Sequence, residues 1–238
     1  MYNKPNLQYG GLSSEDYYTN RRIHQIAKII SDLNFKEYNI LDIGGYNGDL
    51  LFALKKYIKF KINYSIVDFD KSALKLAKKK RIKTYFTDLD NEAFDKYLNL
   101  EKKYNVIVST ECFEHLKFPT MHLERVKFNL QDGGFMIVSL PNENTLYHRI
   151  LAVIGIGLDT YAFKPYKHLH LPTIKQSEMF LLKFAKIYKK QYWISAQFKY
   201  TKMKLLAFLN LLPDNFWQSL ANIFPGLFAR GTIFVLKF

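Results

Sequence analysis

In residues 38–54, YNILDIGGYNGDLLFAL, an apolar segment passes through a glycine-rich turn into a helical pattern. Residues 39–43 are β-branched and mostly apolar, which is typical of a buried strand. After Gly48, apolar residues recur at helical spacing through Leu51 and Leu54. Glycines at such a junction allow positive φ and let a ligand approach the backbone. The stretch predicts a strand–turn–helix unit that binds either a nucleotide phosphate or another nucleoside cofactor.

The composition indicates a folded protein with a large excess of positive charge. Of the 238 residues, 48% are hydrophobic and 16% aromatic, which is enough for a sizeable core and argues against disorder. The net charge of +14 suggests an anionic partner such as nucleic acid, a membrane face or an acidic substrate. The lysine-rich segment 74–83 has the spacing of a helix with one apolar edge, so charge alone does not choose among these partners.

The cysteine content and the polar N-terminus favour a cytoplasmic protein. A single cysteine, Cys112, excludes an intrachain disulfide framework and a cysteine-rich zinc site. No apolar segment typical of a signal peptide follows the start of the sequence. The apolar segment 205–229 is interrupted by Pro213 and Pro225, whereas a membrane span needs about 20 continuous apolar residues.

Strand and helix patterns alternate through the first part of the chain. A helix is expected after Ser13 and Ser14, which are good N-caps. Five strand patterns, separated by stretches capable of forming helices, predict a parallel, doubly wound sheet with right-handed crossovers. These strands are expected at 39–43, 62–67, 83–87, 104–109 and 135–139.

Beyond Pro141 strand and helix patterns no longer alternate regularly. Residues 144–163 have the pattern of a helix followed by a loop. Thr173 and Gln176 form a capping box that opens a helix to about residue 185. Two further strands are expected, at 188–198 and 231–238.

Three acidic residues lie at the ends of successive predicted strands. Ligands of a doubly wound sheet bind outside the carboxyl ends of its strands. Asp68 follows Gly48 by twenty residues, where an acid can accept both hydroxyls of a ribose. Asp42 and Asp88 lie at the neighbouring strand ends, and Asp88 is placed to accept from an adenine amino group. Each acid alone could instead act as a cap: Asp42 of the turn, Asp68 of the helix that follows it, and Asp88 of a helix at 91–100. Together they favour a nucleoside rich in donors and disfavour a pyrophosphate.

Five segments in order resemble the motifs of Rossmann-like (class I) S-adenosylmethionine-dependent methyltransferases, of the small-molecule and glycan-cluster type. The likeness covers residues 20–142, and it departs from the family at Tyr46, where a glycine is usual. It implies an α/β fold with a doubly wound, mainly parallel sheet of seven strands, helices on both faces and a C-terminal antiparallel strand pair, in one domain of residues 1–238. The segments are ILDIGGYNGDL, SIVDFDKSALKLAKKK, YFTDLDN, YNVIVSTECFEHL and NLQDGGFMIVSLPN.

The resemblance implies a site for the cofactor S-adenosylmethionine. Asp42 would lie near the methionine ammonium group, Asp68 would bind the ribose hydroxyls, and Asp88 would accept from adenine. Aromatic and apolar neighbours would pack on adenine, and the end of the fourth strand would line the methionine side. The residues implied are Asp42, Gly44, Gly45, Tyr46, Gly48, Asp68, Phe69, Asp88, Leu89, Thr110 and Glu111.

Histidines are the candidates for catalysis. His115, just past the fourth strand, is placed to act as a general base for a hydroxyl acceptor, and the alternative is a structural role in its loop. His168 and His170 can reach an acceptor pocket. A metal pair with His148 lacks a carboxylate at recognisable spacing, so no metal is expected. Cys112 does not follow a proline, which argues against a nucleophile of the kind used in base methylation.

The expected function is methylation of an oxygen on a small molecule, a sugar or glycan, or a lipid-linked acceptor. A nicotinamide-dependent reductase would need a Tyr-x-x-x-Lys pair, but Tyr200 and Lys204 lie too far downstream. A methyltransferase acting on RNA or another nucleic acid is favoured by the charge, yet the Asn/Asp-Pro-Pro-aromatic motif is absent after the fourth strand. An inactive methyltransferase-like scaffold is suggested by Tyr46.

Two apolar regions lie outside the cofactor-binding half at 20–142. Residues 143–175 are expected to form a lid over the acceptor, and 199–229 to form an insertion before the last strand. Most apolar stretches belong to a core. The alternative is peripheral contact with the inner membrane face, with nearby lysines meeting anionic headgroups. The lipid-facing residues would be Leu206, Phe208, Leu209, Leu212, Phe216 and Trp217.

Overall fold

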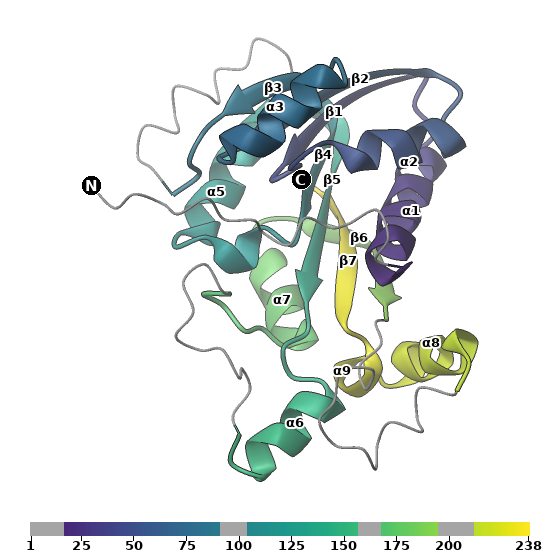
Figure 1. The fold of residues 1–238 in the computed structure, drawn as a ribbon, viewed down its shortest axis with the longest axis vertical. Coiled ribbons are helices and arrows are strands. Elements are labelled where there is room, and N and C mark those ends of the chain that lie inside the picture. Colours follow the sequence, from purple (N-terminus) through teal and green to yellow (C-terminus); the bar gives the residue numbers. More distant parts are fainter. Residues whose placement is uncertain (1–16, 91–103, 157–167, 195–211) are drawn as a thin grey trace.

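A mixed sheet of seven strands runs through the structure, a computed structural model that describes residues 17–90, 104–156, 168–194 and 212–238 (Figure 1). The strand order is β3-β2-β1-β4-β5-β7-β6. The strands are β1 (Glu37–Ile43), β2 (Lys61–Asp68), β3 (Lys83–Phe86), β4 (Tyr104–Thr110), β5 (Leu130–Pro141), β6 (Lys186–Trp193) and β7 (Gly231–Lys237).

The strand directions confirm the predicted fold. Neighbouring strands from β3 through β5 are parallel, whereas β7 runs antiparallel to both β5 and β6. The first two strands of the chain to pair, β1 and β2, extend the sheet in one direction, and β4 then adds on the other side of β1. The winding therefore reverses between β1 and β4, and a ligand of this architecture binds at the carboxyl ends of these two strands.

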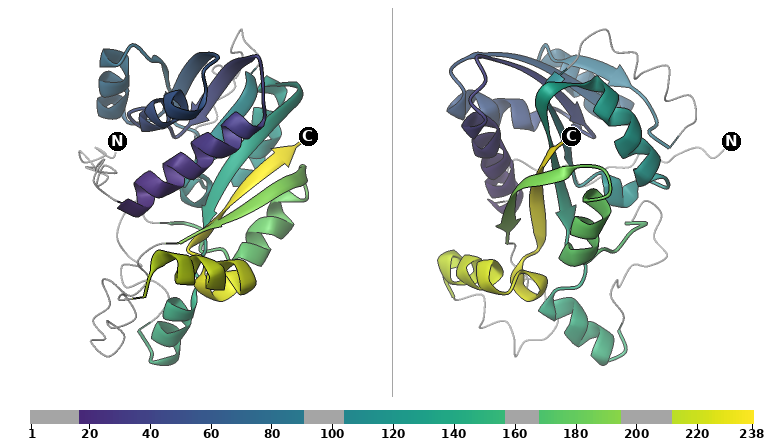
Figure 2. Two further views of the ribbon diagram at one scale, coloured as in Figure 1. Left: turned by 90° about the vertical axis from the view of Figure 1, so that its right-hand side faces the viewer. Right: turned by 180° about the vertical axis from the view of Figure 1, so that it is seen from behind.

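Helices cover both faces of the sheet, as predicted (Figures 1 and 2). One face carries α1 (Tyr17–Asp32), α2 (Asp49–Tyr57) and α3 (Lys71–Lys79). The other carries α5 (Pro119–Val126) and α7 (Ile174–Leu181). Three more helices lie beyond the carboxyl end of β5: α6 (Leu146–Val153), α8 (Asp214–Ile223) and α9 (Pro225–Phe228). Two short 3-10 helices are η2 (Phe113–His115) and η3 (Lys127–Asn129).

The apolar runs that predicted the strands are explained by burial on both faces. In β4, Val106 and Val108 pack in the core beneath α1 and α2, while Ile107 packs on the opposite side with α5. Successive side chains of a strand point to opposite faces, so a strand covered on both sides needs apolar residues throughout. Strands in the centre of the sheet are therefore the easiest to predict from the sequence.

Two elements have boundaries that differ from the predicted ones: β5 begins earlier and α7 ends earlier. β5 begins at Leu130, five residues before the predicted start, because it continues through the glycine pair at 133–134 with a register shift against β4. The capping box of Thr173 and Gln176 is confirmed, but α7 ends at Leu181 because a turn leads directly into β6. The predicted caps Ser13 and Ser14 lie outside the described residues.

The lysine-rich segment forms the predicted helix with one apolar edge. Ala73, Leu74 and Ala77 of α3 are buried, and the lysines lie on its other faces. Its N-cap is Asp70, whose carboxylate accepts hydrogen bonds from the N–H groups of the next turn. The alternative interpretation of Asp68 as the cap of this helix is therefore wrong.

Candidate active site

The turn between β1 and α2 has the left-handed backbone that glycines favour. Gly44 has a φ of 72° and its N–H donates to the carbonyl of Val67 at 2.8 Å, which ties the turn to the end of β2. Gly48 has a φ of 83°, and a β-carbon there would lie 2.4 Å from Cδ1 of Ile82. The conformation therefore favours glycine at position 48, and a larger residue would also have to displace the end of the Ile82 side chain.

Tyr46 also has a left-handed backbone, with a φ of 47°. Its N–H donates to Oδ2 of Asp68 at 2.9 Å. The turn therefore keeps, at a tyrosine, the conformation for which a glycine is usual. The departure from the family motif changes the side chain above the turn without unfolding the backbone.

Asp42 lies beneath this turn and is 3% exposed. Its Oδ2 accepts a short hydrogen bond from the hydroxyl of Tyr64, and its Oδ1 is buried without a hydrogen-bond partner among the described residues. A β-carbon at Gly45 would lie 2.7 Å from the carboxyl group, so only glycine lets the turn close over it. Burial raises the pKa of Asp42 to about 7, against the effect of the Tyr64 hydrogen bond.

Asp68 connects the end of β2 to the glycine turn. Besides the bond from Tyr46, its Oδ1 accepts from the N–H of Asp70 at 2.8 Å. Burial raises the pKa of Asp68, while these backbone donors act in the opposite direction. Its charge also contributes to the raised pKa of Asp42, so the two acids at neighbouring strand ends share one site. Phe69 follows with an exposed ring.

The third acid lies at the end of the next strand. Asp88 is part-buried, and its carboxylate accepts from the N–H of Asp90 at 3.2 Å. Leu89 is buried in the core beside the ends of β1 and β2. The helix at 91–100 that Asp88 was alternatively expected to cap lies outside the described residues.

The end of β4 bears an ion pair that the sequence did not predict. Glu111, with a φ of 49°, accepts from the hydroxyl of Ser139 at 2.6 Å and pairs with the guanidinium of Arg22 at 3.2 Å. Arg22 is buried and its guanidinium lies 4.8 Å from the centre of the Trp193 ring. In the sequence, Arg22 lies beside the apolar stripe of α1, and this position was the signal from which its burial could have been predicted. Thr110, just before Glu111, is part-buried.

A second polar group lies past the end of β4. Glu114, on η2, is 1% exposed, and neither carboxylate oxygen has a hydrogen-bond partner among the described residues. Burial raises its pKa well above the ordinary value. Its Oε1 lies 4.0 Å from Nε2 of His168. The ring of His168 meets that of His115 edge to face, with centroids 4.7 Å apart.

Glu143, just after β5, holds this group in place. Its carboxylate accepts from Nδ1 of His168 at 2.8 Å, and from both terminal nitrogens of Arg230 at 3.2 and 3.4 Å. Although burial opposes ionisation, the His168 hydrogen bond and the Arg230 charge lower the pKa of Glu143 to about 2. Glu143 and Arg230 were not predicted as site residues.

The other sequence candidates lie outside this cluster. His170 directs Nε2 to the carbonyl of Leu116 at 2.8 Å. His148 caps α6 with Thr145 and faces Glu143, so it does not form the metal pair considered from the sequence. Burial raises the pKa of the Cys112 thiol far above its usual range, and a β-carbon at Gly44 would lie 3.1 Å from its sulfur. Tyr200 and Lys204 lie outside the described residues.

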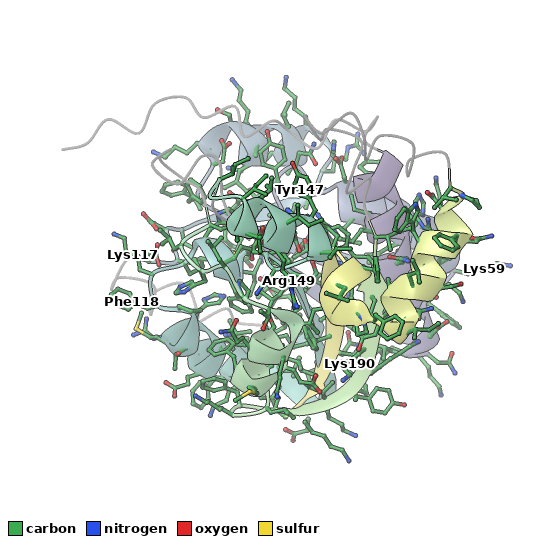
Figure 3. All side chains as sticks on the ribbon, turned by 90° about the horizontal axis from the view of Figure 1, so that it is seen from below. Lys59, Lys117, Phe118, Tyr147, Arg149 and Lys190 are labelled. Atoms are coloured by element: carbon green, nitrogen blue, oxygen red, sulfur yellow. The ribbon has the colours of Figure 1, made fainter. Side chains whose placement is uncertain are left out.

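Helices α6, α8 and α9 gather below this cluster. Seen from below, α6 with Tyr147 and Arg149 lies beside α9 (Figure 3). The side chain of Asn142, buried at the end of β5, donates to the carbonyls of Gly226 and Ala229, which fixes α9 against the sheet. The predicted lid region at 143–175 therefore begins at a firmly held strand end.

Comparisons with solved structures return methyltransferases. A chain from the complex between the Haloferax volcanii Trm112 methyltransferase activator and a methyltransferase matches with a TM-score of 0.58 and 14% identity, over 91% of this chain and 90% of that one. The plantazolicin methyltransferase BpumL, with a monoazolic desmethylPZN analog and SAH, gives 0.56 and 21%, over 92% and 87%. Coclaurine N-methyltransferase, bound to N-methylheliamine and SAH, gives 0.58 and 13%, over 92% and 70%. At these identities the likeness concerns the fold.

Comparisons of sequence assign the family. No curated protein sequence matches the chain. A family model described as a methyltransferase domain matches residues 17–179, which include the strands β1 to β5 and every predicted cofactor-binding residue. The chain belongs to this family of methyltransferase domains.

Proposed function

We propose that the protein binds S-adenosylmethionine and methylates an oxygen of a small-molecule, glycan or lipid-linked acceptor. One observation carries the choice of cofactor: the carboxylates of Asp42 and Asp68 lie together beneath the glycine turn, at the point where the winding reverses. Two buried acids repel a pyrophosphate, whereas they suit a ligand rich in N–H and O–H donors. The SAH in the solved plantazolicin and coclaurine methyltransferases supports the same choice.

The residues of the turn fit such a ligand. Asp42 retains an oxygen without a donor among the described residues, and Gly45 leaves no side chain between this carboxyl group and the turn. Asp68 would accept from the ribose hydroxyls, and the exposed ring of Phe69 would pack on adenine. Asp88, one strand further, would accept from the adenine amino group. S-adenosylmethionine supplies an electrophilic methyl group on a positively charged sulfur when it is bound.

The acceptor side is assigned to the cluster around Glu114, His115 and His168. Glu114 and His115 follow β4, beside the strand ends that would hold the cofactor, and His168 meets them from the segment before α7. An oxygen acceptor must lose a proton during methylation, and histidines and carboxylates are the groups that manage protons near neutral pH. The predicted role of His115 as the general base belongs to this proposal in the absence of a bound metal. The predicted lid at 143–175 also belongs to this proposal, and its residues 157–167 lie outside the described part of the chain.

Two measurements test this function. Calorimetric titration of the full chain with SAH and with NADH should give binding of SAH alone. Transfer of labelled methyl from S-adenosylmethionine to extracts fractionated into small molecules, lipid-linked glycans and RNA should then label one of the first two fractions. Labelling of RNA alone would move the acceptor to nucleic acid, the alternative that the net charge of +14 favours. Binding of NADH without SAH would refute the proposal.

A further inference from the structure

Three side chains that can bind a metal converge past the end of β4. Glu114, His115 and His168 each offer one ligand atom, and these atoms all lie within 4.8 Å of one another. The chain holds the two segments together, because the N–H groups of Leu169 and His170 donate to the carbonyl of Glu114 at 2.8 and 3.1 Å. The group is therefore fixed by the backbone as well as by its side chains.

The carboxylate of Glu114 points to a missing partner. It is 1% exposed and accepts no hydrogen bond from the described residues. A buried carboxylate without a partner is costly, so it needs either a proton or a cation. Its Oε1 lies 4.0 Å from Nε2 of His168, which is too far for a hydrogen bond. A metal with bonds of about 2.1 Å holds ligand atoms up to about 4.2 Å apart, so the gap between these two atoms has the size of an ion. The whole group, with its three ligand atoms within 4.8 Å of one another, would tighten slightly around a bound ion.

Glu143 fixes the histidine that faces this carboxylate. Because Oε1 of Glu143 lies 2.8 Å from Nδ1 of His168, that nitrogen carries the proton. In the neutral imidazole the lone pair is then on Nε2, the atom that faces Glu114. Arg230 donates to the other carboxylate oxygen of Glu143 at 3.2 Å, so Glu143 is held from both sides. A carboxylate behind a histidine in this way is the usual support of a metal-binding imidazole.

We propose that Glu114, His115 and His168 bind one divalent transition-metal ion. Two imidazole nitrogens and one carboxylate oxygen suit Mn²⁺, Fe²⁺, Co²⁺ or Zn²⁺, and they suit Mg²⁺ or Ca²⁺ poorly. Three protein ligands leave coordination positions open for a water molecule or an acceptor. No metal was expected from the sequence, because Glu114 and His168 are separated by more than fifty residues and become neighbours only in the fold.

The role of the ion, unlike its binding, rests on the proposed function. A hydroxyl group bound at an open position has a lowered pKa. Its proton would leave to solvent, its oxygen would form a bond to the methyl carbon, and the sulfur–carbon bond would break to give a neutral thioether. His115 would then donate its lone pair to the ion, so this proposal replaces its predicted role as a general base.

Cobalt is a suitable probe, because its visible absorption reports ligand geometry without any need for activity. Bound metal is removed from the full chain with a chelator, and the chelator is then removed. The protein is titrated with Co²⁺ while its visible absorption is recorded, and with Mn²⁺, Zn²⁺ and Mg²⁺ by calorimetry. We expect one Co²⁺ per chain with a low-symmetry spectrum, and weak Mg²⁺ binding. His168→Ala should reduce Co²⁺ affinity at least 100-fold, and Glu143→Gln by about 10–100-fold through loss of its support.

His170→Ala is the matched control, because it removes a histidine two residues away whose ring lies outside the cluster. It should bind Co²⁺ as the wild type does. If thermal denaturation shows that His168→Ala is not folded, Glu114→Gln takes its place, because glutamine keeps the size and shape of the glutamate side chain. Absence of Co²⁺ binding by the wild type, or equal loss in His168→Ala and His170→Ala, would overturn the metal site. SAH binding without metal binding would refute this inference alone, and metal binding without SAH binding would refute the cofactor proposal alone.

Discussion

At the scale of single residues, Asp42 links the pH of the solution to the stability of the fold. Its pKa of about 7 lies well above the ordinary value near 4, so the folded protein retains a proton that the unfolded chain loses. The stabilisation of the folded state by this proton is complete below about pH 4 and is lost as the pH rises through about 7. The free energy of unfolding falls by about 4 kcal/mol at most over this range.

Asp42→Asn should remove this dependence, because an amide can still accept from Tyr64 and carries no charge at any pH. We expect its free energy of unfolding, from urea denaturation, to change less than that of the wild type between about pH 5 and about pH 7. Parallel curves for the two proteins would show that Asp42 is ionised in the fold at all these pH values.

Tyr46 and Gly48 give opposite predictions within one turn. Both have left-handed backbones, which cost a residue with a side chain about 1–2 kcal/mol. Tyr46→Gly relieves this cost, but glycine also has a greater conformational entropy in the unfolded chain, which opposes folding. Because the two effects offset each other, the free energy of unfolding should change by no more than about 1 kcal/mol. Gly48→Ala should destabilise by about 1–3 kcal/mol, because its β-carbon would meet the side chains of Ile82 and Ile66. Loss of SAH binding in a folded Tyr46→Gly protein would show that the tyrosine is part of the cofactor site.

At the scale of elements, α1, β4 and β5 are joined by Arg22, Glu111 and Ser139. The Arg22–Glu111 pair is largely shielded from solvent, so its coupling should exceed that of a surface pair. A double-mutant cycle with Arg22→Met and Glu111→Gln should give a coupling of about 1–3 kcal/mol in thermal or urea unfolding. A coupling near zero would leave α1 held by its apolar stripe alone.

What the sequence could predict follows from how each element is stabilised. The strands β1, β2 and β4 were located within two residues, because burial on both faces leaves an uninterrupted apolar run. The start of β5 was missed, because residues 131–133 are exposed and the segment contains two glycines. In the site, Asp42 and Asp68 were recognisable from their positions at strand ends. The Glu143–Arg230 pair was not, because it joins residues 87 positions apart that only the sheet brings together.

At the scale of the whole molecule, one end carries several exposed apolar side chains. Helices α6, α8 and α9 lie together there (Figures 1 and 3). Val153 is 86% exposed and Ile223 66% exposed, with Ile154 and Phe224 beside them in the chain. Trp217, predicted to face lipid, instead packs against Phe228, and Leu206, Phe208 and Leu209 lie outside the described residues. No helix in the described part of the chain is long and apolar enough to cross a membrane.

We expect this end to bind anionic vesicles, which would suit a lipid-linked acceptor. The wild type should float with anionic vesicles, and Ile223→Asp/Phe224→Asp protein should stay behind. Phe128→Asp is the control, since Phe128 is 72% exposed on η3, before β5 rather than after it. Wild-type protein that stays in the soluble fraction with both anionic and neutral vesicles would rule out the membrane contact.

We propose that the acids at the reversal of the sheet bind the nucleoside of S-adenosylmethionine, and a substitution of Asp68 is the sharpest test of this. Calorimetric titration with SAH should compare the wild type, Asp68→Ala and Asp70→Ala. Asp70 is the matched control, because it is an acid two residues away whose carboxylate caps α3. Asp68→Ala should lose about 1–3 kcal/mol or more of binding free energy, since the ribose hydroxyls lose a charged acceptor. Asp70→Ala should bind as the wild type does and lose about 1 kcal/mol of stability. Equal SAH affinity in wild type and folded Asp68→Ala would contradict the account.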